Sequence, residues 1–175
     1  TEQVIEYLRS VYIGSKTREL DLSDMNLFTF PPEVADVQGL RHLSINNNKL
    51  LGLPSILGRL TDLTSLSAFN NQIASLPAEI GKLTKLTTMM LHENAVSYLP
   101  EEIGDMLSLK EFVLNDNKLK ELSIGMMRLT SLVTLQIANN QVRNVPSWTW
   151  KLSRLTTLNV EGNPLESPPD KILER

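Results

Sequence analysis

The 175-residue sequence contains no cysteine. A disulfide framework, a thiolate nucleophile, an iron–sulfur cluster and a cysteine-based zinc site are therefore excluded. Extracellular repeat proteins often close their ends with disulfide caps, which this chain cannot form. It also has no Asn-X-Ser/Thr glycosylation sequon, and the two absences together favour a cytoplasmic location.

An excess of basic residues is also missing, since 17 Lys and Arg stand against 20 Asp and Glu and the formal net charge is −3. Phosphate backbones and anionic membrane surfaces attract basic proteins, so we expect neither nucleic acid nor a membrane as a partner. No apolar run approaches the roughly 18 residues that a membrane-spanning helix requires. The first ten residues, TEQVIEYLRS, have neither the basic start nor the apolar core of a signal peptide.

Groups that could form a catalytic or metal site are few. His42 and His92 are the only histidines, and neither lies in a metal-ligand spacing such as H-E-x-x-H. The glycines are scattered or mark the ends of short helical segments, so the chain has no glycine-rich phosphate loop. We therefore predict a protein that has no catalytic activity and binds no metal or cofactor.

What the sequence does contain is a repeat of 23 residues with the pattern L-x-x-L-x-L-x-x-N-x-L-x-x-L-P-x-x-I-G-x-L. Seven units begin at Thr17, Leu40, Leu63, Leu86, Leu109, Leu132 and Leu155. Alternating apolar and polar residues in the first half of each unit predict a strand. The second half, as in LPAEIGKLTKL, predicts a short turn of helix or looser coil on the opposite side. Each unit alone leaves its apolar face open, so stacking must create the core.

The repeat thus predicts an α/β solenoid over residues 17–169. We expect a curved right-handed coil with a parallel sheet of about seven strands on its concave side, and a monomer. A capping helix within residues 1–16 is indicated by apolar residues at helical spacing, namely Val4, Ile5, Leu8, Val11 and Tyr12. After Pro168 and Pro169, residues 170–175 predict a final turn that carries Ile172 and Leu173.

One asparagine recurs at the point where each strand turns away. The six are Asn48, Asn71, Asn94, Asn117, Asn140 and Asn163. A side-chain amide at this point can bond both N–H and C=O groups of neighbouring turns, so we interpret the column as a structural ladder. Met25 holds the position in the first unit, where we expect an irregular turn.

Units five and six depart from the convex pattern. Ser123 replaces the usual proline in LSIGMMRL, and Trp148 and Trp150 flank the isoleucine position in VPSWTWKL. The simpler interpretation is that Met126, Met127 and one tryptophan fill the same core volume. A second tryptophan exposed to solvent would instead indicate a binding site on the convex side.

These motifs resemble the 23-residue, leucine-proline-type leucine-rich repeats of intracellular proteins in the Ras-group class, which includes scaffolds of Ras signalling and Roco-type proteins. The resemblance covers residues 17–169 and implies a binding module. It does not specify the partner, because such repeats occur in scaffolds, in enzyme-linked recruiting domains and in microbial effectors. In several of these proteins a last repeat like GNPLESPPDKILER precedes a helix like TEQVIEYLR, which here stands first. We therefore expect the chain to be part of a longer repeat protein.

Stacking places the third, fifth, seventh and eighth residues of every unit on the concave sheet face. Seven of these 28 positions are acidic and none is basic, whereas an even spread of basic residues would put roughly three there. Side chains on adjacent rungs touch because neighbouring strands lie about 4.8 Å apart. An apolar cluster on adjacent rungs in the middle of this face indicates a binding hot spot, although single exposed apolar residues are ordinary. Its members are Phe69, Met90, His92 and Val113.

We therefore expect a protein-interaction module that binds a partner on its concave sheet face, as a scaffold or recruiting domain in signalling. The apolar cluster would anchor an apolar part of the partner, and nearby carboxylates would attract a basic rim around it. These carboxylates are Glu93, Asp116, Glu111 and Asp21. Two alternatives remain open, namely the regulatory arm of a larger GTPase, kinase, cyclase or nuclease, and a secreted microbial effector or surface ligand.

Overall fold

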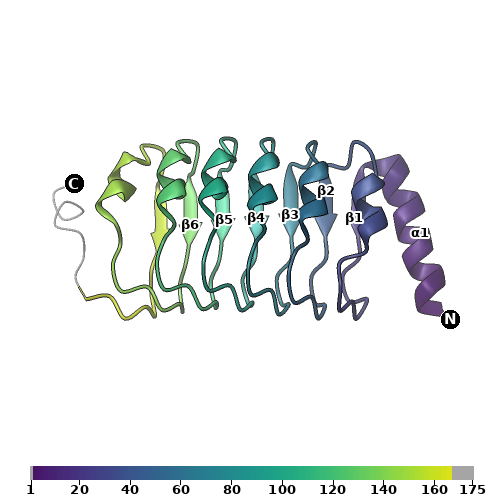
Figure 1. Ribbon diagram of the computed structural model, residues 1–175, viewed down its shortest axis with the longest axis horizontal. Helices are drawn as coiled ribbons and strands as arrows, with labels where there is room; N and C mark the ends of the chain where they lie inside the picture. The colour runs from purple at the N-terminus through teal and green to yellow at the C-terminus, as the bar shows by residue number, and fades with distance from the viewer. Residues whose placement is uncertain (1, 167–175) are drawn as a thin grey trace.

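The computed structural model describes residues 2–166 of the chain. Seven strands form one parallel sheet in sequence order, from β1 to β7. Short 3₁₀-helices lie on the opposite, convex side, and a single α-helix covers the N-terminal end (Figure 1). The expected solenoid with a seven-stranded parallel sheet is confirmed. The turn expected at residues 170–175 lies outside the described residues.

Each turn of the solenoid contributes one strand of three residues and, in the first six turns, one 3₁₀-helix of five residues. The strands are β1 (Glu19–Asp21), β2 (His42–Ser44), β3 (Ser65–Ser67), β4 (Thr88–Met90), β5 (Glu111–Val113), β6 (Thr134–Gln136) and β7 (Thr157–Asn159). The helices are η1 (Pro32–Asp36), η2 (Ser55–Arg59), η3 (Ala78–Lys82), η4 (Glu101–Asp105), η5 (Ile124–Arg128) and η6 (Ser147–Lys151). Residues paired between strands are 23 positions apart, as in Thr88 with Glu111, so the sheet register equals the repeat register.

One core runs through the whole stack because the middle residue of each strand points inward while its two neighbours point out. These middle residues are buried from β1 to β6, and they are Leu20, Leu43, Leu66, Met89, Phe112 and Leu135. Apolar residues of the convex helices, such as Ile80 and Ile103, close the core from the other side. The alternation read from the sequence is thus a burial pattern, with the outward side chains left for the concave sheet face.

A column of glycines sets the spacing of the convex helices. Gly58, Gly81 and Gly104 occupy equivalent positions in η2, η3 and η4. A Cβ atom on Gly58 would lie 2.7 Å from the carbonyl oxygen of Glu79 in the next helix. At Gly81 and Gly104 a Cβ would overlap the carbonyl oxygens of Glu102 and Gly125. The glycines therefore do more than mark helix ends, because they let successive turns approach closely.

The recurring asparagines bond the backbone of two turns at once. In Asn94 the amide Nδ2 donates to the carbonyl oxygens of Ala68, at 2.9 Å, and Leu91, at 3.1 Å. Its Oδ1 accepts from the Ile73 N–H at 2.9 Å. The same three bonds recur at Asn48, Asn71, Asn117, Asn140 and Asn163. Each amide thus satisfies turn backbone groups that would otherwise lie unpaired.

Helix α1 (Glu2–Thr17) packs on β1 with a face different from the one expected. Tyr7 and Val11 contact the core, and the Tyr7 hydroxyl donates to Glu33 Oε1 at 2.7 Å. A Cβ on Gly14 would come within 3.1 Å of the Leu20 Cβ, so the helix approaches the first strand closely at this residue. The expected capping face is therefore wrong for four of its five residues, which are exposed, namely Val4, Ile5, Leu8 and Tyr12.

Candidate protein-binding site

Two aromatic rings stack at the centre of the concave sheet face. Phe69 and His92 hold the seventh position of neighbouring units, two residues beyond the ends of β3 and β4. Their ring centroids lie 4.5 Å apart with an interplanar angle of 14°. Both side chains are partly exposed, as is Met90 at the end of β4. The three residues form an apolar platform open to solvent, called here the central platform.

Val113 lies beside this platform rather than on it. It pairs with Met90 in the register of β4 and β5 but is only 8% exposed. A partner on the concave sheet face would gain little direct contact with so buried a side chain. Val113 therefore lies next to Met90 without adding exposed surface, and the exposed part of the expected cluster is reduced to Phe69, Met90 and His92.

In units two and five the side chain at the seventh position accepts a backbone hydrogen bond from the next unit, which Phe69 and His92 do not do. In Asn46 and Asn115 the side-chain Oδ1 accepts the N–H of the seventh residue of the next unit, from Phe69 at 3.0 Å and from Ala138 at 2.8 Å. Phe69 has no polar side-chain atom. The Nδ1 of His92 is buried without a hydrogen-bond partner, the only such side-chain atom in the part of the chain that the structure describes. The platform thus replaces stabilising backbone bonds with exposed rings.

The expected carboxylates fall into two groups. Glu111 lies on β5 opposite Thr88, while Glu93 and Asp116 stand exposed in the turns that follow β4 and β5. Asp21 is on β1, three strands from Met90, or about 14 Å at the usual strand spacing. Over residues 2–166, none of the four forms an ion pair with a basic side chain. All four carboxylates are therefore available to a basic partner, three of them close to the central platform.

Asp21 belongs to a separate hollow of about 500 Å³ between α1 and the first three strands. Hydroxyl groups dominate its polar lining, together with Glu19 and His42. Beside it, Ser67 Oγ donates to Asn46 Oδ1 and Asn46 Nδ2 donates to Ser44 Oγ, both at 2.8 Å. This polar network escaped the sequence-based prediction, although the asparagines at the seventh position of units two and five were a signal for it.

The turn residues Glu93 and Asp116 also occupy a position where the backbone has a positive φ. The residue before each ladder asparagine has a positive φ, between 52° and 56° at Asn47, Asn70, Glu93, Asp116 and Asn139 and 70° at Gly162. Asp24, which precedes Met25 in the first unit, has a φ of 61°. Asn and Asp tolerate this left-handed conformation better than other non-glycine residues do. Backbone geometry thus partly explains why aspartates such as Asp116 occur at this turn position. It does not explain Glu93, because glutamate does not favour the left-handed conformation.

Across residues 2–166 no three His, Asp or Glu side chains gather in a way that could hold a metal ion. In the same range no helix is both long and apolar enough to cross a membrane.

Comparison with known sequences gives two partial matches. The leucine-rich-repeat family matches residues 107–165, and a second model of the same repeat matches residues 39–60. No curated protein sequence matches the chain.

Solved structures extend the likeness to nearly the whole chain. A leucine-rich-repeat protein of Leptospira interrogans is similar at a TM-score of 0.66 and 27% identity, over 94% of this chain and 54% of that one. The leucine-rich repeat domain of the type III effector XopL gives 0.87 and 21%, over 96% and 61%, which shows the fold alone. The plant peptide hormone receptor RGFR1, solved in complex with RGF2, gives 0.70 and 27%, over 77% and 22%.

The chain spans 54% of the Leptospira protein and 22% of the plant receptor, so repeats of this kind are parts of larger molecules there. Domains of this type are generally non-catalytic binding modules that present a long stacked surface. Its strand register and the similar solved structures show that this chain has the fold of a leucine-rich-repeat solenoid.

Proposed function

We propose that the chain is a protein-interaction module whose concave sheet face binds another protein, as a scaffold or recruiting domain in signalling. The observation that carries the proposal is the stacked pair of Phe69 and His92. Their partly exposed rings occupy positions where units two and five place backbone-bonding asparagines. A lost backbone bond costs stability, so a contact made by the rings is the use that accounts for them.

The partner that fits this face carries an apolar or aromatic side chain within a basic rim. The central platform offers a flat apolar contact, and aromatic and methionine side chains are frequent among hot-spot residues. Glu111, Glu93 and Asp116 surround it without basic neighbours among the outward positions. Carboxylates without an ion pair speed the approach of a positively charged protein and disfavour acidic ones.

The proposed setting follows from composition and motif. The LPAEIGKL-type units resemble the intracellular, Ras-group type of repeat, and the lack of cysteine and of glycosylation sequons supports the proposal of a cytoplasmic module. The plant peptide hormone receptor RGFR1 was solved in complex with RGF2. By analogy, a partner with an extended segment suits the row of strands here.

Affinity capture with paired variants tests the proposal. The whole chain, Phe69→Ala and the control Phe28→Ala are used to capture proteins from the organism that makes this one, and bound proteins are quantified by mass spectrometry. Phe28 is an exposed phenylalanine in the turn after β1, away from the central platform. Proteins retained by the chain and by Phe28→Ala but lost with Phe69→Ala are the expected partners.

Direct binding of one captured protein completes the test. Its affinity for Phe69→Ala should fall by roughly tenfold or more, as for a hot-spot aromatic, while Phe28→Ala binds as the unaltered chain does. Equal capture by all three proteins, each with an unchanged denaturation midpoint, would refute a site at the central platform.

A further inference from the structure

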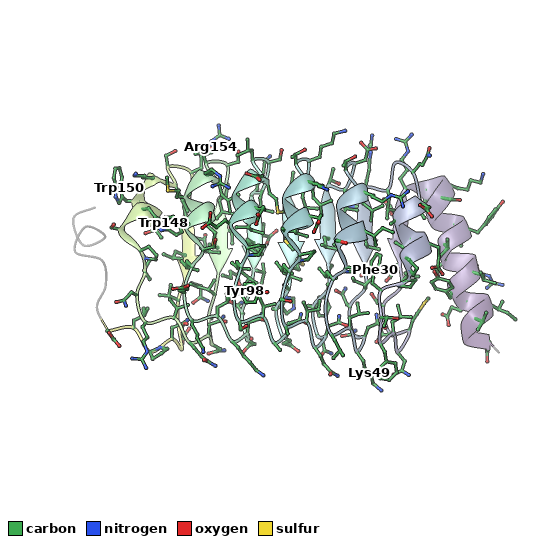
Figure 2. All side chains as sticks on the ribbon, in the orientation of Figure 1. Phe30, Lys49, Tyr98, Trp148, Trp150 and Arg154 are labelled. Atoms are coloured by element: carbon green, nitrogen blue, oxygen red, sulfur yellow. The ribbon has the colours of Figure 1, made fainter. Side chains whose placement is uncertain are left out.

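A second apolar patch lies on the convex side at the C-terminal end of the solenoid. Trp150 in η6 is 53% exposed, and Ile124 and Met127 in η5 are 50% and 38% exposed. Ile124 and Met127 are three residues apart in a 3₁₀-helix, so they share one face. Met127 and Trp150 hold equivalent positions of neighbouring units. Figure 2 shows Trp150 at the end of the stack away from α1, with Trp148 and Arg154 in the same two final turns.

Folding does not account for a tryptophan at this position. Units two to four have Gly58, Gly81 and Gly104 there, and unit one has Ala35. The core in this unit is closed instead by buried Thr149 and Leu152, with partly buried Trp148 packed against it. Trp150 therefore exposes a large indole where a small residue suffices, and exposed apolar patches of this kind mark interaction sites.

The charge of this region is opposite to that of the concave sheet face. Residues 122–160 contain four basic residues and no Asp or Glu, although an even spread of acidic residues would put about four there. Arg128 and Arg143 are held in ion pairs with Asp105 and Glu166. Lys151 places its ammonium 5.8 Å from the Trp150 ring centroid, and neither it nor Arg154 has an ion pair among the described residues.

We propose that this patch is a second docking site, for an acidic peptide segment that carries an apolar side chain. The apolar side chain would pack on Trp150 and Met127, while carboxylates of the peptide pair with Lys151 and Arg154. A Trp ring beside a cation is a favourable contact for such a segment, because the ring packs against an apolar side chain while the cation pairs with a neighbouring carboxylate. The site is separate from the central platform and does not depend on it.

An anionic membrane fits the same patch less well. Surface-binding segments usually need clusters of about four to eight Lys or Arg residues or a second anchor. Among the described residues, Lys151 and Arg154 are the basic residues of this region without an ion pair, and η6 offers one exposed tryptophan. An acidic peptide needs fewer charges because it can pair directly with both.

Parallel selection of displayed peptides tests the second site. A library of short random peptides is selected on the chain, on Trp150→Gly and on Phe69→Ala. Peptides enriched on the chain and on Phe69→Ala, but not on Trp150→Gly, should carry acidic residues around one apolar residue. Trp150→Gly restores the residue that units two to four use at this position, so its denaturation midpoint should not fall.

Fluorescence then measures the affinity of one selected peptide. Trp148 and Trp150 are the only tryptophans, so their emission reports directly on the site. Trp150→Gly and Lys151→Glu should each weaken binding by about tenfold or more. For Trp150→Gly, which lacks the reporting indole, binding is followed by the fluorescence anisotropy of a labelled peptide. Phe69→Ala should bind normally, which separates this site from the proposed concave one.

Three results would overturn the proposal. One is an absence of acidic peptides whose enrichment requires Trp150. Another is Trp150-dependent binding to vesicles rich in phosphatidylserine, which would identify a lipid surface as the ligand. The last is Trp150-dependent self-association in sedimentation velocity, which would mean that the patch meets the acidic concave sheet face of a second copy.

Discussion

Gly104 and Gly125 face each other across the convex side, each at the point where the other helix comes closest. A Cβ on Gly104 would overlap the carbonyl oxygen of Gly125, and one on Gly125 would overlap the carbonyl oxygen of Glu101. In η5 the glycine has moved two positions along the helix, and Met127 takes the place of the column glycine. The pair therefore permits the close packing of η4 on η5 although the repeat pattern changes there.

Gly104→Ala should destabilise the protein by about 1–3 kcal/mol, because the methyl group cannot enter without moving backbone atoms. Gly52→Ala is the matched control, since a Cβ there meets nothing within 4 Å and its φ is not positive. That control should leave stability unchanged or raise it slightly through a less flexible unfolded chain. Urea denaturation of both variants measures the difference, and equal midpoints would contradict the packing role of the column.

Asn94→Leu should lower the free energy of unfolding by on the order of 1–3 kcal/mol. The change removes bonds to Ala68, Leu91 and Ile73, and it leaves their turn backbone groups unpaired. Asn144→Leu is a control at an exposed asparagine outside the ladder. If both variants shift the urea midpoint alike, the ladder does not stabilise the middle turns.

Glu93→Asn should stabilise the chain by on the order of 0.5–1 kcal/mol. Glu93 has a φ of 55°, in the left-handed region where Asn and Gly are common and Glu is not. Its N–H and C=O bonds to Asn115 and Asn71 involve the backbone and survive the change. Glu121→Asn removes the same charge from an exposed residue whose φ is not positive. A thermal midpoint no higher for Glu93→Asn than for Glu121→Asn would show that the turn is unstrained.

The sequence predicted what its period encodes and missed what depends on contacts between turns. The 23-residue step gave the parallel register and the inward positions, because both follow from strand alternation. The burial of Val113 and the capping face of α1 do not follow from period. Val113 is covered by neighbours on the sheet, and α1 turns toward β1 through Gly14, whose small size matters only once Leu20 is beside it.

Docking of α1 should depend on pH through Tyr7 and Glu33. Burial, and then the hydrogen bond to Glu33, raise the pKa of Tyr7 above its ordinary value of 10.0. The bond from Tyr7 lowers the pKa of Glu33 below its ordinary value of 4.5. The Glu33 contribution to stability is therefore present above pH 4.5 and is lost as pH falls through its lowered pKa. The Tyr7 contribution is present below pH 10 and is lost as pH rises above it.

Tyr7→Phe removes both contributions at once. The stability difference between the chain and Tyr7→Phe should be largest between about pH 5 and 9 and should shrink on either side. Because Glu33 is exposed, solvent limits the size of the effect. Denaturation midpoints across this range measure it, with Tyr98→Phe, an exposed tyrosine far along the chain, as the control. A difference that does not vary with pH would mean that the hydrogen bond does not hold α1 in place.

Binding on the concave sheet face should separate into two kinds of kinetic effect, if the proposed function holds. Glu111→Lys reverses an unpaired charge beside the central platform, so it should slow association of a basic partner and weaken its salt dependence. Phe69→Ala removes a desolvated ring contact instead, so it should mainly speed dissociation, by an amount worth roughly 1–3 kcal/mol. Asp21→Lys tests how far the contact extends. Asp21 lies three strands from Met90, so its charge should matter only for a partner that reaches the N-terminal hollow. Rates measured by surface plasmon resonance at two salt concentrations distinguish these effects. A Glu111→Lys variant with unchanged association, together with a Phe69→Ala variant of unchanged dissociation, would remove the central platform from the contact.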